Sequence, residues 1–192
     1  MALYSDISVL TEIKDMKDIT PIQQRFILHW GEMGVRWGIN RTMAQIHALL
    51  YLSPEPLNAE TICDRLGVAR SNVSNSLREL QNWGIVKIVH LPGDRRDHFE
   101  SMKDVWEMFR QVLDERKKRE IDPTIEVLSD CTAAAEKEKD RYTHDRIAAM
   151  RDFFATMGTW YEQIDALPTP AVIRFIKMGG KLQKLLGKGG KT

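Results

Sequence analysis

The chain has 192 residues, of which 43% are hydrophobic and 29% charged, and its formal net charge is +1. This composition is typical of a soluble globular protein and excludes both extensive disorder and a strongly basic overall surface. The start of the chain is too polar for a signal peptide, and no apolar run approaches the roughly 20 residues of a membrane span. We therefore expect a cytoplasmic protein without membrane association, in which any surface that binds nucleic acid is local.

Residues 1–39 are predicted to be mostly helical and to contribute to dimerisation. Thr20 and Pro21 suit the N-cap and the first turn of a helix. The apolar side chains that follow recur at steps of four, three and four residues: Phe26, Trp30, Met33 and Trp37. This spacing indicates one face of a helix, although Gly31 and Gly34 weaken the prediction.

Residues 40–103 are predicted to form a domain of three helices and a β-hairpin. The helices are expected at about 41–52, 59–66 and 70–83. Asn58 suits the N-cap of the second helix, and Gly67 can adopt the left-handed conformation that ends it. The β-branched segment IVKIVH, the Pro-Gly turn and the segment DHFES then predict the hairpin. This order of elements is that of a winged helix-turn-helix, so the predicted fold class is mainly α with a small β-hairpin.

The third helix of this domain has one apolar stripe, and its other positions carry short polar side chains or arginines. These outer residues include Arg70, Ser71, Asn72, Ser74, Asn75 and Arg78. Serine and asparagine are poor helix formers, so such a face is unusual for a helix that meets only solvent. Short hydrogen-bonding groups and arginines suit the base edges and phosphates of a major groove. We therefore predict that this helix binds double-stranded DNA.

The turn of the hairpin adds Arg95 and Arg96, which a wing could place in the adjacent minor groove or along the backbone. Asp94 and Asp97 flank these arginines and could orient them through charge-assisted hydrogen bonds. The alternative for this turn is a polar hairpin with solvated charges. The window 69–96 holds five basic residues (Arg70, Arg78, Lys87, Arg95 and Arg96) and two acidic ones (Glu79 and Asp94). A basic patch is therefore present locally, as the small net charge requires.

Three segments of the chain resemble the MarR-type winged-helix regulators: LGVARSNVSNSLRELQNWGIV, PGDRRDHF and KKREIDPTIEVL. Within that family they most resemble the branch typified by the repressor of glycine-betaine synthesis. The resemblance implies a homodimer that binds a sequence-specific operator and controls transcription, and we expect a repressor that acts on a pseudo-palindromic operator. It also implies that the polar residues of helix 70–83 meet the major groove and that Arg95 and Arg96 lie on the wing. The alternative function is a non-specific nucleic-acid-binding architectural or interaction protein.

The chain departs from its relatives just before this helix, where Ala69 stands at a position that is often serine. Alanine cannot cap a helix, a loss of about 1 kcal/mol. Two explanations remain open: Ser71 caps a helix that starts later, or the helix end is left for a phosphate.

Residues 104–192 are predicted to form a helical dimerisation region. A long helix reaches Pro123, where either Asp122 caps a new helix or one continuous helix is kinked. A last helical region over 143–187 is divided by the segment LPTP at 167–170. Apolar stripes without a partner in these helices suggest a subunit interface, and hence a homodimer whose symmetry matches its operator.

The end of the chain, residues 171–192, holds six basic residues and no acidic one. Three interpretations remain open for it: a dimer-packing helix with a solvated lysine face, an additional phosphate contact, or an interfacial membrane helix.

Four tryptophans outside the predicted DNA-binding domain could form an aromatic box: Trp30, Trp37, Trp106 and Trp160. Such a box can hold a quaternary ammonium by cation–π attraction, and the resemblance suggests a choline-like effector. Aromatic residues at helical spacing are, however, more often part of a core. The chain contains no ligand spacing typical of a metal site, no phosphate-binding loop and no nucleophile elbow, so we expect no metal, no cofactor and no enzymatic activity. Cys63 and Cys131 are expected to be buried, reduced thiols.

Overall fold

The computed structural model describes residues 18–186, and the side chains up to residue 178. The chain divides into two units, one that ends at Val112 and one that begins at Leu113. The predicted helical content of residues 1–17 and the side chains of the tail lysines beyond Lys177 lie outside the described part. No helix between residues 18 and 186 combines the length and the apolar character needed to cross a membrane.

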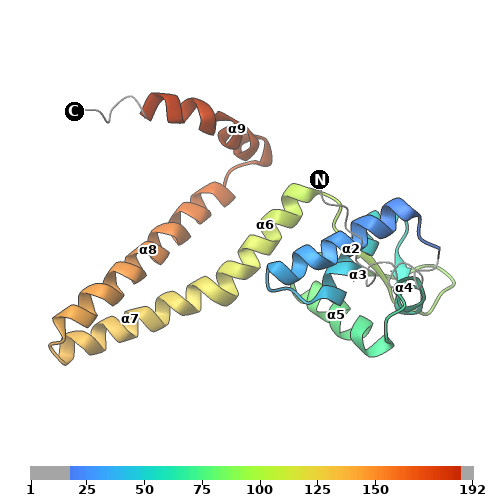
Figure 1. Cartoon of the computed structure of the whole chain (residues 1–192), viewed down its shortest axis with the longest axis horizontal. Helices are drawn as coiled ribbons and strands as arrows, with labels where there is room; N and C mark the ends of the chain where they lie inside the picture. Colours follow the sequence, from blue (N-terminus) through green and yellow to red (C-terminus); the bar gives the residue numbers. More distant parts are fainter. Residues whose placement is uncertain (1–17, 187–192) are drawn as a thin grey trace, which may run out of the picture. The chain divides into compact units, whose positions relative to one another are not determined.

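The first unit contains the predicted helices, the predicted hairpin and one additional strand (Figure 1). Its helices are α2 (Pro21–Arg36), α3 (Arg41–Leu52), α4 (Ala59–Leu66), α5 (Arg70–Asn82) and the start of α6 (Val105–Arg116). Its strands are β1 (Leu57–Asn58), β2 (Val86–Val89) and β3 (His98–Ser101).

The ends of these helices are set by local hydrogen bonds, as the sequence predicts. Thr20 caps α2, because its hydroxyl accepts from the Gln23 N–H at 3.3 Å and its own N–H donates to the Gln23 carboxamide at 3.0 Å. Asn58 caps α4 by accepting from the Thr61 N–H at 2.9 Å. Gly67 ends α4 with φ +64°, in the left-handed region.

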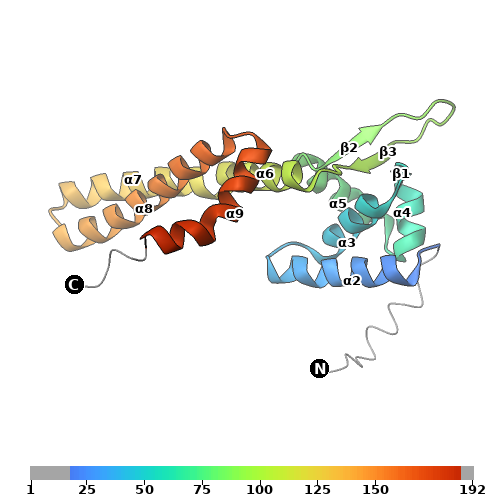
Figure 2. The ribbon, with the colours of Figure 1, turned by 90° about the horizontal axis from the view of Figure 1, so that it is seen from above.

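The three strands form an antiparallel sheet in the order β1-β3-β2. Phe99 of β3 lies opposite Leu57 of β1 and Ile88 of β2. The loop between β2 and β3 extends away from the sheet as the wing (Figure 2). The sequence analysis did not predict β1, because two residues are too few to show an alternating pattern.

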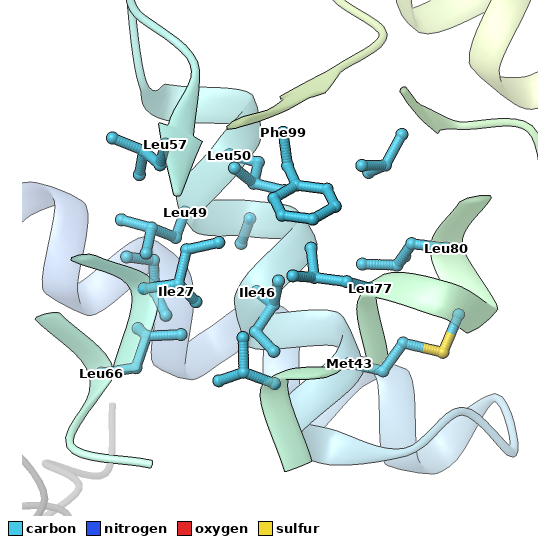
Figure 3. Packing of buried hydrophobic residues seen from close by; sticks show 14 of the residues in the cluster. Ile27, Met43, Ile46, Leu49, Leu50, Leu57, Leu66, Leu77, Leu80 and Phe99 are labelled. Atoms are coloured by element: carbon cyan, nitrogen blue, oxygen red, sulfur yellow. The ribbon is translucent and has the colours of Figure 1, made fainter. Parts of the chain in front are cut away.

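The core of the first unit lies between α3, α5 and the sheet. Ile46 and Leu50 of α3 face Leu77 and Leu80 of α5, with Phe99 closing one end of the cluster (Figure 3). The first four of these residues are at most 2% exposed. The apolar stripe predicted for helix 70–83 is therefore buried, and it fixes which face of α5 turns outward.

The second unit consists of helices that follow α6: the π-helical turn η1 (Lys117–Ile121), α7 (Asp122–Lys137), α8 (Arg141–Asp165) and α9 (Thr169–Leu186). Helices α7 and α8 run side by side as a hairpin (Figure 1). The predicted break at 167–170 separates α8 from α9. Cys131 is exposed, contrary to our expectation, because α7 packs along one side only; Cys63 is half-buried.

The helix is continuous through Pro123, so the alternative in which Asp122 caps a new helix is wrong. The Asp122 N–H donates to the Lys117 carbonyl, five residues earlier, which widens the turn before the proline. This π-type turn absorbs the hydrogen bond that Pro123 cannot make. The Asp122 carboxylate instead accepts from the Lys117 ammonium at 2.9 Å.

Candidate nucleic-acid interface

The outer face of α5 is exposed along the whole predicted set of residues. Arg70, Ser71, Asn72, Ser74, Asn75 and Arg78 are all exposed, whereas Val73 and Leu77 between them are at most 2% exposed. Arg78 donates to the Asn75 side-chain oxygen at 3.5 Å, which aligns two of these polar groups along the helix. The core holds one face of α5 and leaves hydrogen-bonding groups on the other.

Helix α5 starts at Arg70, with Ala69 in the N-cap position and in an extended conformation (φ −63°, ψ 143°). Within the described chain no side chain caps this first turn, so the explanation in which Ser71 caps a later start is wrong. The first backbone N–H groups of α5 are therefore left without a side-chain acceptor. Helix starts of this kind carry a partial positive charge and are suited to phosphate.

Glu60 of α4 connects the start of α5 to the wing. Its carboxylate lies 3.4 Å from Arg70 and 3.4 Å from Arg96. The sequence analysis missed this residue, because an acidic side chain ten positions before Arg70 carries no local signal of the contact. The two arginines are thus held near each other although 26 positions separate them in the chain, from 70 to 96.

Asp94 orients Arg96 on the wing, as the sequence suggests. Its carboxylate accepts from the Arg96 backbone N–H at 3.0 Å, from Nε at 3.0 Å and from Nη2 at 2.6 Å. These hydrogen bonds hold the pKa of Asp94 well below its ordinary value and raise that of Arg96. His98 lies 3.6 Å from the same carboxylate, and its other ring nitrogen lies 3.0 Å from the Arg96 carbonyl.

The other two charged residues of the wing behave differently. Asp97 lies 3.9 Å from His90 and does not take the orienting role that we expected for it. Arg95 is exposed, and no ion pair is formed by it within residues 18–178. Its guanidinium is therefore available to a phosphate without first breaking a contact.

A hollow of about 430 Å³ lies between α5 and the wing. Four of the predicted DNA-binding residues line it: Arg70, Ser74, Arg78 and Arg96. Glu60 and Gln81 line it as well. The other predicted residues, Ser71, Asn72, Asn75 and Arg95, are exposed outside this hollow. The structure thus brings together residues of α4, α5 and the wing on one concave surface, whose charged residues are three arginines, Glu60 and Asp97.

The four tryptophans of the predicted aromatic box have different surroundings. Trp30 of α2 stacks on Phe26 with ring centres 5.4 Å apart. Trp37 follows the last residue of α2 and is 66% exposed. Trp106 packs edge-on against Phe109. Trp160 belongs to α8 in the second unit and is 49% exposed.

A buried helix pair, a third helix with an exposed polar face and an antiparallel hairpin define this domain as a winged helix-turn-helix. Residues 37–97 match the sequence profile described as the MarR family. This match covers the domain from the end of α2 to the wing, and the DNA-binding residues predicted from the sequence fall inside it. This match identifies the family and does not distinguish its branches, so it does not assign the domain to the glycine-betaine branch.

One solved structure shows the same fold over a longer part of the chain. A crystal structure of a transcriptional regulator matches with a TM-score of 0.60 and 20% identity, covering 82% of this chain and 99% of that one. A transcriptional regulator from Thermotoga maritima matches with a TM-score of 0.36 and 19% identity, covering 80% of this chain and 96% of that one. The likeness in fold rests on the first structure alone. No curated protein sequence matches the chain.

Proposed function

We propose that the protein is a sequence-specific DNA-binding regulator of transcription that acts as a repressor on a pseudo-palindromic operator. The observation that carries the proposal is the concave surface between α5 and the wing, where Arg70, Arg78 and Arg96 converge with polar side chains of α5. The MarR-family match over residues 37–97 supports it. The resemblance of the motifs to the glycine-betaine branch supports a place in that branch.

In this proposal α5 enters the major groove and the wing lies along the neighbouring backbone. Asn72, Ser74 and Asn75 offer both donors and acceptors to base edges. Arg95 supplies a charge to a phosphate or to the minor groove. The uncapped start of α5 at Ala69 offers backbone N–H groups to another phosphate.

We also propose that the protein is a homodimer in which α8 contributes to the interface. Helix α8 carries an exposed apolar stripe at steps of three, four and three residues: Met150, Phe153, Met157 and Trp160, each 45–61% exposed. A stripe of large apolar side chains along one helix is typical of a helix–helix interface. A second copy of the same stripe would cover it by two-fold symmetry.

Analytical ultracentrifugation of the Phe153→Glu variant tests the dimer. We expect dissociation at micromolar concentration, because a buried glutamate opposed to its own symmetry mate is strongly unfavourable. Thr159→Glu is the matched control, since Thr159 is exposed on α8 but lies off the stripe. A wild-type protein that sediments as a monomer, or two variants that dissociate equally, would rule out this interface.

Sequence-specific binding can be tested in two steps. Fragments that the protein binds are first selected from genomic DNA, and the protein is then titrated with the selected site and with random DNA. We expect Asn75→Ala to weaken binding to the selected site by about 1–3 kcal/mol and to affect random DNA much less. Asn82→Ala is the control, because it removes the same side chain two turns closer to the end of α5. The N-terminal part of a recognition helix makes most base contacts, so its effect should be smaller.

The same titration distinguishes the non-specific architectural alternative. If random competitor DNA displaces the protein as readily as the selected fragment does, and Asn75→Ala weakens both equally, the protein is a non-specific binder.

A further inference from the structure

The last helix of the second unit, α9, leaves large apolar side chains uncovered by the other described residues (Figure 1). Val172 near its start is 7% exposed. Three apolar residues that follow are 42–56% exposed: Phe175, Ile176 and Met178. Single exposed apolar residues are normal on a protein surface, but a group of large ones marks a site of contact. This part of α9 is therefore suited to a partner that removes apolar side chains from water.

Basic side chains adjoin the apolar side of α9. Arg174 and Lys177 are exposed and three residues apart, so they share one side of the helix. Phe175 and Met178 have the same spacing and lie about 100° further around the helix. The long side chains of arginine and lysine can keep their charged ends in water beside an apolar surface that the helix enters. Helix α9 is thus amphipathic, with positive charge along the edge of its apolar side.

The positive charge is particular to this end of the chain. Residues 171–192 hold six basic residues and no acidic one, whereas residues 1–170 hold 22 basic and 27 acidic ones. Along the sequence of α9 the lysines continue at steps of four and three residues, at Lys177, Lys181 and Lys184. This spacing follows the period of a helix. The occupant of this surface should therefore carry negative charge and also be able to cover apolar side chains.

Three occupants differ in how they meet these two requirements. Duplex DNA would neutralise the basic residues but would leave Phe175, Ile176 and Met178 in water. A second copy of α9 would cover the apolar side, but it would bring like charges together, because α9 contains no acidic residue. The surface of an anionic bilayer meets both requirements, since lipid phosphates attract the basic residues and acyl chains take up the apolar ones.

We propose that α9 binds the surface of membranes rich in anionic lipids and lies in the plane of the interface, with Phe175 and Met178 turned towards the acyl chains. Of the three interpretations that the sequence left open for residues 171–192, this is the interfacial membrane helix. The expectation of a chain without membrane association rested on the absence of a spanning segment and of a signal peptide, and a helix that lies on the surface needs neither. Binding to lipid does not depend on the proposed DNA binding.

Co-sedimentation of the full chain with vesicles tests the lipid class. Two compositions serve as probes: phosphatidylcholine alone, and an equimolar mixture of phosphatidylcholine and phosphatidylglycerol. We expect the mixture to bind at least about tenfold more tightly, because each basic residue near an anionic surface contributes about fivefold in affinity. Added salt should weaken the binding, since it screens this attraction.

Variants of Phe175 test the insertion of the apolar side. Phe175→Ser should weaken binding to the mixed vesicles about tenfold, because no phenyl ring then leaves water. Phe175→Trp should bind at least as tightly as the wild type, since tryptophan favours the membrane interface. Val127→Ser is the matched control: it removes an apolar side chain that is 60% exposed on α7, and it should leave vesicle binding unchanged.

A variant of Lys177 tests the contribution of charge. Lys177→Gln should weaken binding to the mixed vesicles about fivefold and change binding to phosphatidylcholine little. Lys137→Gln is the control, because Lys137 is an exposed lysine at the end of α7. Neither variant should change the affinity for a short DNA duplex, and Phe175→Ser should not change the sedimentation of the protein without vesicles.

Four results would overturn the proposal. The first is absent binding to the mixed vesicles, or equal binding to both compositions. The second is an equal effect of Phe175→Ser and Val127→Ser on vesicle binding. The third is a loss of DNA affinity in Lys177→Gln with vesicle binding unchanged, which would make the basic side a DNA contact. The fourth is dissociation of a dimer by Phe175→Ser, which would make α9 a subunit interface.

The vesicle experiments contain no DNA, so their failure leaves the DNA-binding proposal standing. Failure of the DNA titrations likewise leaves the lipid contact standing.

Discussion

The carboxylate of Glu60 lies 3.4 Å from the Nη1 atom of Arg96, so a residue of α4 holds an arginine of the wing. The same carboxylate lies 3.4 Å from Arg70 at the start of α5. All three side chains are 55–60% exposed, and exposed ion pairs contribute at most about 1 kcal/mol to stability. The effect of Glu60 is therefore on the charge and geometry of the basic surface more than on folding.

We expect Glu60→Gln to strengthen binding to DNA about two- to fivefold at low salt, because it removes a negative charge that competes with phosphate for two arginines. The melting temperature should change little. Filter binding or fluorescence anisotropy with a short duplex measures the effect, and Glu55→Gln, an exposed glutamate outside the hollow, is the control. A loss of affinity in Glu60→Gln alone would show instead that Glu60 positions the arginines for DNA.

The two neighbouring arginines of the wing should differ in their contribution to salt dependence. Arg95 is exposed and unpaired within the described chain, whereas Arg96 already contacts Asp94 and Glu60. Arg95→Ala should lower the slope of log K against log salt by about 0.9, the value for one phosphate contact, and Arg96→Ala by less. Titrations at several salt concentrations measure both slopes. A larger change for Arg96→Ala would mean that Arg96 exchanges its carboxylate partners for phosphate.

The sequence predicted those parts of the fold that depend on nearby residues. The capping of α2 by Thr20 and of α4 by Asn58 involves residues three positions away, and the buried stripe of α5 repeats with the helix period. Long-range contacts carry no such pattern. The Glu60–Arg96 pair and the strand pairing of Leu57 with Phe99 join segments more than 30 residues apart. The burial of His47 likewise depends on what packs around α3, and was not predicted.

Gly34 is another residue whose role the sequence did not indicate. We expected Gly31 and Gly34 to weaken the helix, but α2 approaches α3 closely at this point. A Cβ atom on Gly34 would lie 2.7 Å from the Cβ of Ala44. Neither atom belongs to a flexible side chain, so the helices would have to separate.

We expect Gly34→Ala to lower the free energy of unfolding by about 1–2 kcal/mol, as overpacking of a close helix contact does. Gly158→Ala is the control, because its Cβ would meet only the end of the Lys117 side chain at 3.9 Å. Because a methyl group fits there without a close contact, alanine should stabilise the helix by about 0.5–1 kcal/mol. Urea unfolding measures both variants. Addition of Ala44→Gly to Gly34→Ala should cost less than the two single changes added together, and additive effects would exclude the close contact as the cause.

The buried imidazole of His47 should make the first unit less stable in acid. Its pKa is about 4 in the folded protein, lowered by burial and then by Lys103, against an ordinary value of 6.5. Between these two values the unfolded chain binds a proton that the folded chain does not, so stability falls as the pH drops from 6.5 towards 4. At pH 5 the loss amounts to about 2 kcal/mol relative to pH 7.5. Urea unfolding at both pH values should show this loss in the wild type and in His144→Leu, and a smaller loss in His47→Leu. An equal loss in all three proteins would show that folding does not lower the pKa of His47.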